Sequence, residues 1–314
     1  MSATNRVLVT GATGFVGRQL LVPLLRRGYE VHAVSRRAVA DLPAEVVLHA
    51  ADLLDCAGHR QLLEHIRPSH LLHSAWYVEH GKYWNAPENY FWLKATVSLV
   101  ESFCQAGGIR AVGVGTCAEY DWKWGLLVEG QTPEQPASHY GSAKLAAGRN
   151  AAAMAAAHGV GFAWARIFFP FGPGEPENRL IPHIVTHLLK GEPAHCTHGR
   201  QVRDFLYVAD VGAALAALLD SSVQGPINIG SGVPATIGDV AARLGAALER
   251  PDLIMLGAVA DAEGSPETIL ASNLRLAREV GWTPTHSLDE GLRLTIDWWR
   301  EAVAPRNMNG TLTT

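Results

Sequence analysis

The chain has 314 residues, a formal net charge of −4 and 48% hydrophobic residues. This length predicts one large or two closely joined domains, and the charge gives no reason to expect nucleic acid or an anionic membrane as a partner. The start of the chain lacks a signal peptide pattern, no apolar run is long enough to span a bilayer, and the four cysteines have no zinc or disulfide spacing, so we expect a cytoplasmic protein with reduced thiols and no membrane contact.

The chain opens with an apolar strand at residues 7–10, a glycine turn and a helical apolar pattern from Leu20 to Leu25. In the turn, Gly11 permits a tight bend, Gly14 lets the backbone approach a pyrophosphate, and Gly17 allows close packing of helix on strand. The phosphates would then lie at the N-terminus of the helix. The sequence therefore predicts a dinucleotide site formed by Gly11, Thr13, Gly14, Phe15, Val16 and Gly17.

The end of the second predicted strand, residues 30–34, indicates which dinucleotide is bound. An NAD enzyme usually places an acidic residue here to bind the ribose 2′-hydroxyl, whereas this chain has Ser35, Arg36 and Arg37. Arginine forms bidentate hydrogen bonds with phosphate, so these residues favour NADP(H) over NAD(H). The alternative is a solvated basic turn.

Further strands are predicted at residues 46–50, 70–74, 111–115 and 161–167, and helical patterns separate them. This alternation predicts an α/β fold with a doubly wound parallel sheet (Rossmann) and a smaller C-terminal α/β substrate domain. The expected NADP-binding domain comprises residues 1–169 and about 207–230. The expected substrate domain comprises residues 170–206 and about 231–306, and residues 307–314 are expected to form a flexible tail.

Tyr140 and Lys144 lie four positions apart in a predicted helix and therefore share a face. The ammonium would stabilise the phenolate and lower the pKa of Tyr140 toward the working pH. On its own such a pair is usually solvated. Together with the dinucleotide turn and Thr116 at an upstream strand end, the pair predicts a hydride-transfer enzyme.

Further motifs follow in order along the chain: Asp52-Leu53, His73-Ser74-Ala75, Arg166-Ile167-Phe168, Phe171-Gly172-Pro173-Gly174, Arg203-Asp204-Phe205 and Asn228-Ile229-Gly230. With these motifs the chain resembles an extended short-chain dehydrogenase/reductase of the nucleotide-sugar epimerase/dehydratase/reductase group, over about residues 6–300. The resemblance implies that Thr116, Tyr140 and Lys144 form the catalytic triad.

The resemblance also implies cofactor contacts beyond the glycine turn. Asp52 and Leu53 correspond to adenine contacts, and His73, Ser74 and Ala75 to the loop under the nicotinamide ribose, which Tyr140 and Lys144 also approach. For each of these residues, the alternative to a cofactor contact is a purely structural role. For His73 that alternative is a packed, hydrogen-bonded histidine at a strand end.

The substrate implied by the resemblance is a small molecule, a nucleotide sugar. The residues expected to bind it are Trp76, Cys117, Glu119, Phe169, Arg179, Leu180 and Arg203. Arg203 matches a diphosphate-binding arginine, and the alternative is an ion pair with Asp204 or Asp210. Trp92 and Phe169 replace asparagines usual in the family, so the pocket is expected to be more apolar.

The expected reaction is NADPH-dependent reduction of a keto group on a nucleotide-linked 4-keto-6-deoxy sugar. Dehydration is disfavoured because Cys117 and Ala118 stand where 4,6-dehydratases have an Asp-Glu pair, and Glu119-Tyr120 resembles the reductases. A nucleotide-sugar 4-epimerase and a non-enzymatic NADP-binding regulator stay open as alternative functions.

We also expect a homodimer. No metal is expected, because two histidine groups that could bind one, His183 with His187 and His195 with Cys196 and His198, lack the partners of a zinc site.

Overall fold

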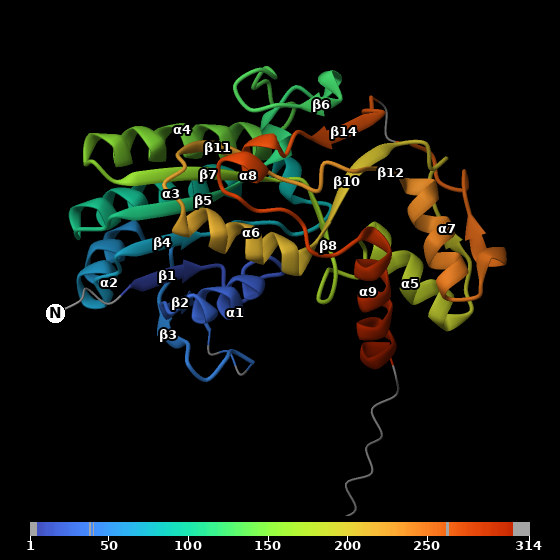
Figure 1. The fold of residues 1–314 in the computed structure, drawn as a ribbon, viewed down its shortest axis with the longest axis horizontal. Coiled ribbons are helices and arrows are strands. Elements are labelled where there is room, and N and C mark those ends of the chain that lie inside the picture. The colour runs from blue at the N-terminus through green and yellow to red at the C-terminus, as the bar shows by residue number, and fades with distance from the viewer. Residues whose placement is uncertain (1–4, 38, 40, 262–263, 304–314) are drawn as a thin grey trace, which may run out of the picture.

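The computed structural model describes residues 5–37, 39, 41–261 and 264–303, and its centre is a parallel sheet (Figure 1). The strands of this sheet are β1 (Arg6–Thr10), β2 (Glu30–Ser35), β3 (Val47–Ala50), β4 (His70–His73), β5 (Arg110–Thr116), β7 (Gly161–Ile167) and β11 (Gly225–Ile229). Their order is β11-β7-β5-β4-β1-β2-β3, and all pairs are parallel. The order reverses between β1 and β4, where ligands bind in such sheets. The predicted doubly wound fold is confirmed.

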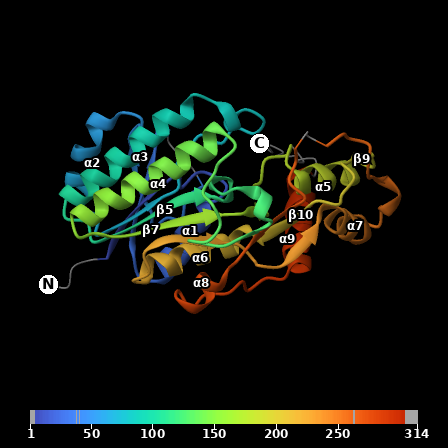
Figure 2. The same ribbon diagram turned by 90° about the horizontal axis from the view of Figure 1, so that it is seen from above.

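Helices cover both faces of the large sheet (Figure 2). The leucines of α1 (Arg18–Arg26) and α6 (Val208–Asp220) bury themselves on one face. On the other face, α2 (His59–Ile66), α3 (Glu88–Gln105) and α4 (His139–Ala157) form a second apolar cluster with the strands. Both layers exclude water from the sheet, which is why its central strands are continuously apolar.

Trp164 on β7 shows how closely this second layer is packed. A Cβ on Gly113, Gly115 or Gly148 would lie 2.4, 2.3 or 2.7 Å from atoms of the Trp164 ring. The absence of side chains at Gly113, Gly115 and Gly148 therefore leaves the space that the Trp164 indole occupies. This brings α4 and β5, which carry the expected catalytic residues, close to each other.

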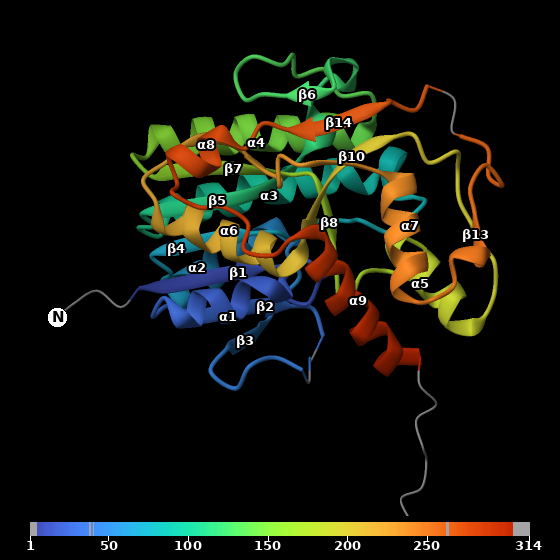
Figure 3. The same cartoon turned by 45° about the vertical axis from the view of Figure 1, so that its right-hand side comes forward.

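A second group of elements lies at one end of the large sheet (Figure 3). A smaller sheet has the order β12 (Pro234–Thr236), β10 (Val202–Tyr207), β14 (Thr268–Ala271) and β6 (Leu126–Leu127), with β8 (Phe169–Phe171) paired to β10. The helices α5 (Leu180–Lys190), α7 (Ile237–Ala247) and α9 (Leu288–Val303) share one apolar cluster. The remaining elements are α8 (Leu274–Arg278), the strand pair β9 (Ala194–His195) and β13 (Ile254–Met255), and the short 3₁₀ helices η1 (Cys56–Gly58), η2 (Tyr83–Asn85), η3 (Cys117–Glu119), η4 (Trp122–Trp124) and η5 (Pro251–Leu253).

The proposed division into two domains stays a prediction. β6, from the predicted first domain, pairs with β14 of the predicted second domain, so the two parts share a sheet. The predicted tail, residues 307–314, lies outside the described residues. Within the described part of the chain, no helix combines the length and apolarity needed to cross a membrane.

Candidate active site

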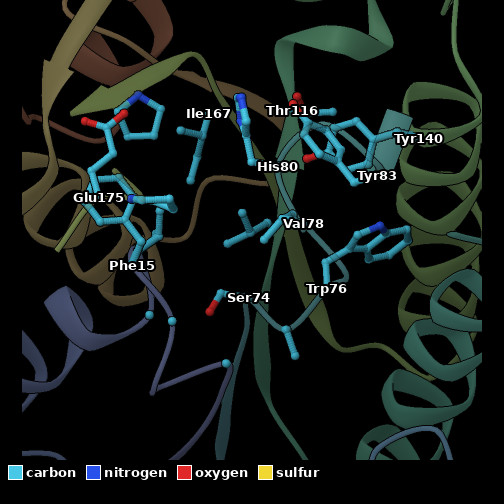
Figure 4. A pocket seen from close by; sticks show the side chains of 18 of the residues that line it. Phe15, Ser74, Trp76, Val78, His80, Tyr83, Thr116, Tyr140, Ile167 and Glu175 are labelled. Atoms are coloured by element: carbon cyan, nitrogen blue, oxygen red, sulfur yellow. The ribbon is translucent and has the colours of Figure 1, made fainter. Parts of the chain in front are cut away.

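A cavity of about 1020 Å³ lies at the carboxyl ends of β1, β2, β4, β5 and β7 (Figure 4). The predicted site residues that line it are Gly11, Thr13, Gly14, Phe15, Val16, Gly17, Ser35, Arg36, Arg37, Asp52, Leu53, Ser74, Ala75, Trp76, Thr116, Cys117, Tyr140, Lys144, Phe169, Arg179, Leu180 and Arg203. Segments spread over much of the chain thus meet around one space. Two predicted residues, His73 and Glu119, lie outside this lining.

The glycine turn is built by close backbone approach. Gly11 has a φ of +70°, and a Cβ there would lie 2.7 Å from the Ser74 hydroxyl oxygen and from the Ala75 nitrogen. A Cβ on Gly17 would lie 1.9 Å from the Gly11 carbonyl oxygen. Gly17 is therefore required by contact between the start of α1 and the turn itself. The result is a helix N-terminus directed at the cavity, which suits an anionic group.

Ser35, Arg36 and Arg37 line the cavity at the end of β2, and both arginines are exposed. The Ser35 hydroxyl accepts a hydrogen bond of 3.2 Å from the Arg37 backbone nitrogen. Asp52, on the neighbouring loop, accepts a bond of 3.0 Å from the Leu54 nitrogen. Both arginines thus border the cavity at the end of β2, and NADP(H) preference stays a prediction.

The start of α4 is held against η3, which sets the catalytic geometry. Ser138 caps α4 by accepting a hydrogen bond of 3.1 Å from Gly141, and a Cβ on Gly141 would lie 2.2 Å from the Ala118 carbonyl oxygen. Tyr140, next to Gly141, therefore lies close to Thr116 at the end of β5, and both side chains line the cavity (Figure 4). Their role as catalytic partners stays a prediction.

The electrostatics of Tyr140 and Lys144 differ from the expectation. Burial raises the pKa of Tyr140 above its ordinary value, Tyr83 adds to this, and the nearby Thr116 hydroxyl opposes it. Burial lowers the pKa of Lys144 to about 7. The Lys144 ammonium donates to the Val114 carbonyl at 2.6 Å and lies 4.0 Å from the centre of a Trp76 ring. The expectation that Lys144 lowers the pKa of Tyr140 is therefore wrong for this structure, because burial dominates and Val114 and Trp76 hold the ammonium.

His73 is a core residue. Its ring nitrogens lie 2.7 Å from the Thr10 hydroxyl oxygen and 2.8 Å from that of Thr96, and burial lowers the pKa of His73 to about 3. The ring is neutral, and both of its nitrogens have partners. The predicted direct contact of its side chain with a cofactor is not supported, and the packed alternative describes it better.

Glu119 also lies behind the cavity wall. Its carboxylate accepts hydrogen bonds from the Thr116 nitrogen at 2.8 Å, the Trp164 indole at 2.9 Å and Arg166 Nε at 2.7 Å. With every oxygen engaged and no exposure, it cannot bind substrate directly. Its effect is to fix the end of β5 and thereby Thr116.

Arg203 does line the cavity, and its guanidinium donates to the carbonyls of Val202 at 2.8 Å and Pro266 at 3.0 Å. Its ion-pair alternative is not observed. Asp204 instead accepts bonds from Ser231 and its neighbours, and Asp210 from Thr285 and His286. Among the described residues, the hydrogen-bond partners of Arg203 are all backbone carbonyls, which leaves its charge available to a ligand phosphate.

Cys117 lines the cavity but is buried, which raises its pKa to about 12. Its thiol is neutral at physiological pH and cannot take the acid–base role of a dehydratase carboxylate. Phe169 lies beside it in a common apolar cluster, with Arg203 5.6 Å from its ring centre. This part of the wall is apolar, as the replaced asparagines predict.

The structure adds lining residues that the sequence did not identify as site residues. Tyr83 and Trp84 contact the Tyr140 ring edge-on, with ring centres 4.9 and 5.8 Å away, and Trp122 contacts Trp84. The aromatic run at residues 76–92 was a signal for the first two. Glu175 also lines the cavity, and its proline-flanked loop gave no signal for a buried carboxyl.

The histidines considered for metal binding lie outside the cavity lining. His183 and His187 have ring centres 4.1 Å apart, with the ring planes tilted by 51°, and His198 pairs with Asp261 at 2.8 Å. Among residues 5–37, 39, 41–261 and 264–303, no group of three or more metal-ligating side chains is found.

Comparison with known proteins places this geometry among nucleotide-sugar enzymes. The chain is 27% identical over 321 residues to a UDP-glucose 4-epimerase of Streptomyces lividans, covering 94% of this chain and 95% of that protein. It is 29% identical over 320 residues to a dTDP-6-deoxy-L-talose 4-dehydrogenase (NAD(P)(+)) of Kitasatospora kifunensis, with 97% and 98% covered. The crystal structure of the Thermus thermophilus UDP-glucose 4-epimerase complex with NAD superposes with a TM-score of 0.81 and 28% identity, over 95% of this chain and all of that one.

The sequence profile of the NAD dependent epimerase/dehydratase family matches residues 7–230. This range contains the glycine turn, Thr116, Tyr140 and Lys144. The chain is an enzyme of the extended short-chain dehydrogenase/reductase type and belongs to the NAD dependent epimerase/dehydratase family.

Proposed function

We propose that the enzyme uses NADPH to reduce a keto group on a nucleotide-linked 4-keto-6-deoxy sugar. The observation that carries this proposal is that one cavity is lined both by Ser35, Arg36 and Arg37 and by Thr116, Tyr140 and Lys144. Gly14 lines the cavity, and a Cβ there would meet only the Gly11 carbonyl oxygen, at 3.2 Å, so the absence of a side chain at Gly14 lets a pyrophosphate approach the turn. When bound, the dinucleotide supplies the hydride to the ketone carbon.

Two side chains of the enzyme then bind and protonate the oxygen of the ketone. Tyr140 donates its proton to the developing alkoxide, and Thr116, which lies beside Tyr140 in the cavity wall, holds the same oxygen. Reduction needs Tyr140 protonated at the start, and burial favours that form. Lys144 holds the nicotinamide ribose, and Arg203 with Arg179 binds the substrate diphosphate. The Kitasatospora relative supports chemistry at the sugar 4-position with either dinucleotide.

The alternative is a nucleotide-sugar 4-epimerase, which would return the hydride to the same carbon. The NAD in the Thermus thermophilus structure favours this alternative. Ser35, Arg36 and Arg37 argue against it, because no acid stands at the end of β2 to bind a ribose 2′-hydroxyl. A non-enzymatic NADP-binding regulator is less well supported, because it would not need Tyr140 and Lys144 at the cavity.

The proposal is tested by measuring whether the reaction consumes NADPH. Incubation with NADPH and a nucleotide-linked 4-keto-6-deoxy sugar should consume one NADPH per product, measured by absorbance, with slower turnover on NADH. If these ketones are inert while a UDP-hexose is epimerised without added cofactor, the reductase proposal fails and the epimerase stands.

We also propose that the enzyme is a cytoplasmic homodimer joined through the outer face of α3 and α4, which lie side by side (Figure 2). Tyr90 and Phe91 on α3 are 51% and 60% exposed, and α4 presents small residues beside them. Light scattering should give a dimer for the unmodified chain and a monomer for Phe91→Glu. A monomeric unmodified chain would contradict the proposal.

A further inference from the structure

Glu175 is a buried carboxyl in the wall of the cavity, on the loop between β8 and α5. The residue is only 5% exposed. Oε1 accepts a long hydrogen bond of 3.3 Å from Arg179 Nε, whereas Oε2 is buried with no hydrogen-bond partner in the described part of the chain. Buried carboxyl oxygens are rarely left without a donor. Oε2 therefore has an unused capacity to accept a hydrogen bond.

The charge of the surrounding wall makes an acid here unexpected. The cationic lining residues are Arg36, Arg37, Lys144, Arg179 and Arg203. Among the described lining residues the only acids are Asp52 and Glu175, and Asp52 already accepts a bond from the Leu54 nitrogen. A wall of this charge suits an anionic ligand, and an acid in it would repel that ligand unless the ligand also presents a donor to the acid.

The position of Glu175 indicates which part of a bound molecule would contact it. Figure 4 shows Glu175 above Phe15 of the glycine turn, on the side of the cavity opposite Thr116 and Tyr140. A molecule that reaches from the glycine turn to Tyr140 passes this side chain. In a purely structural role, Glu175 would hold Arg179 through Oε1 alone, and the burial of Oε2 without a hydrogen-bond donor would have no explanation.

We propose that Glu175 is a specificity-determining residue whose free oxygen, Oε2, turned toward the cavity by rotation of the side chain, accepts a hydrogen bond from an N–H or O–H group of the molecule bound there. The donor belongs either to the dinucleotide or to the sugar nucleotide, and both present such groups. This inference rests on the proposed function in that it takes the cavity to bind these two molecules.

The test compares Glu175→Gln with Glu177→Gln by calorimetric titration. Glutamine keeps the shape and an oxygen for Arg179, but its NH₂ is a donor and cannot accept a bond at the position of Oε2. Glu177 is an exposed acid on the same loop, paired with Lys190 at 3.5 Å, so its variant controls for the loss of one charge. One arm titrates NADPH and NADH, and the other titrates a UDP-sugar and a dTDP-sugar into the enzyme with NADP⁺ present.

In one of the two arms, Glu175→Gln should weaken binding by about ten-fold to a hundred-fold, as expected when a ligand donor loses its buried acceptor, and Glu177→Gln should not. The arm that changes identifies the source of the donor. The ligand-free variant should melt no lower than the unmodified enzyme, because the carboxyl it replaces has an unpartnered oxygen. Equal affinities of Glu175→Gln and the unmodified enzyme in both arms would overturn the inference. If the unmodified enzyme binds none of these molecules, it is the proposed function that fails.

Discussion

Lys144 should make the ligand-free enzyme markedly less stable at neutral than at alkaline pH. Its ordinary pKa of 10.5 falls to about 7 in the folded protein, and its side chain is almost fully buried. Between these values the unfolded chain binds the proton and the folded chain does not, so stability rises with pH. Below pH 7 both states are protonated, and the full cost of the buried ammonium is present. Each pH unit contributes about 1.4 kcal/mol, so from about pH 7 to 9.5 the gain is about 3 kcal/mol.

The measurement is urea unfolding of the unmodified enzyme and Lys144→Met at several pH values in this window. Methionine retains an unbranched side chain of similar length without the charge, so the variant should be more stable at pH 7, and the difference should shrink by about 3 kcal/mol as the pH approaches 9.5. Lys190→Met, at the end of α5 with a half-exposed side chain, is the matched control and should run parallel to the unmodified enzyme. Parallel curves for Lys144→Met as well would refute the reasoning, because Lys144 would then titrate alike in both states.

Three further substitutions test other parts of the site. Tyr140→Phe removes the proton donor and keeps the ring, so turnover should fall by about two to four orders of magnitude while calorimetry still detects NADPH binding; unchanged turnover would remove Tyr140 from its role. Arg36→Ala should erase most of a preference for NADPH over NADH, and equal affinities in the unmodified enzyme would show that no preference exists. Gly17→Ala places a Cβ 1.9 Å from the Gly11 carbonyl oxygen, so dinucleotide binding should be lost; full binding by fluorescence titration would show that the turn can rearrange.

Local sequence patterns were sufficient to predict the Rossmann sheet and most of the cavity lining. Apolar runs separated by helical patterns specify a parallel sheet, and the carboxyl ends of its strands necessarily meet at one edge. Residues at or just after strand ends, such as Ser35, Ser74 and Thr116, were therefore placed correctly at the cavity from their positions along the chain. The predicted extent of β7, residues 161–167, agrees with the structure for the same reason, since its apolar run is bounded at both ends.

Burial and the choice of hydrogen-bond partner were decided only by the tertiary structure, because both depend on segments that are distant in sequence. Glu119 was expected to bind substrate, but Arg166 and Trp164, some 45 residues further on, hold it in the wall. Tyr140 and Lys144 share a helix face as predicted, yet burial by surrounding elements drives their pKa values in directions that their spacing does not reveal. Glu175 lies in a proline- and glycine-rich loop whose sequence does not reveal that its carboxyl is buried, because desolvation is a property of the assembled fold and not of any one segment.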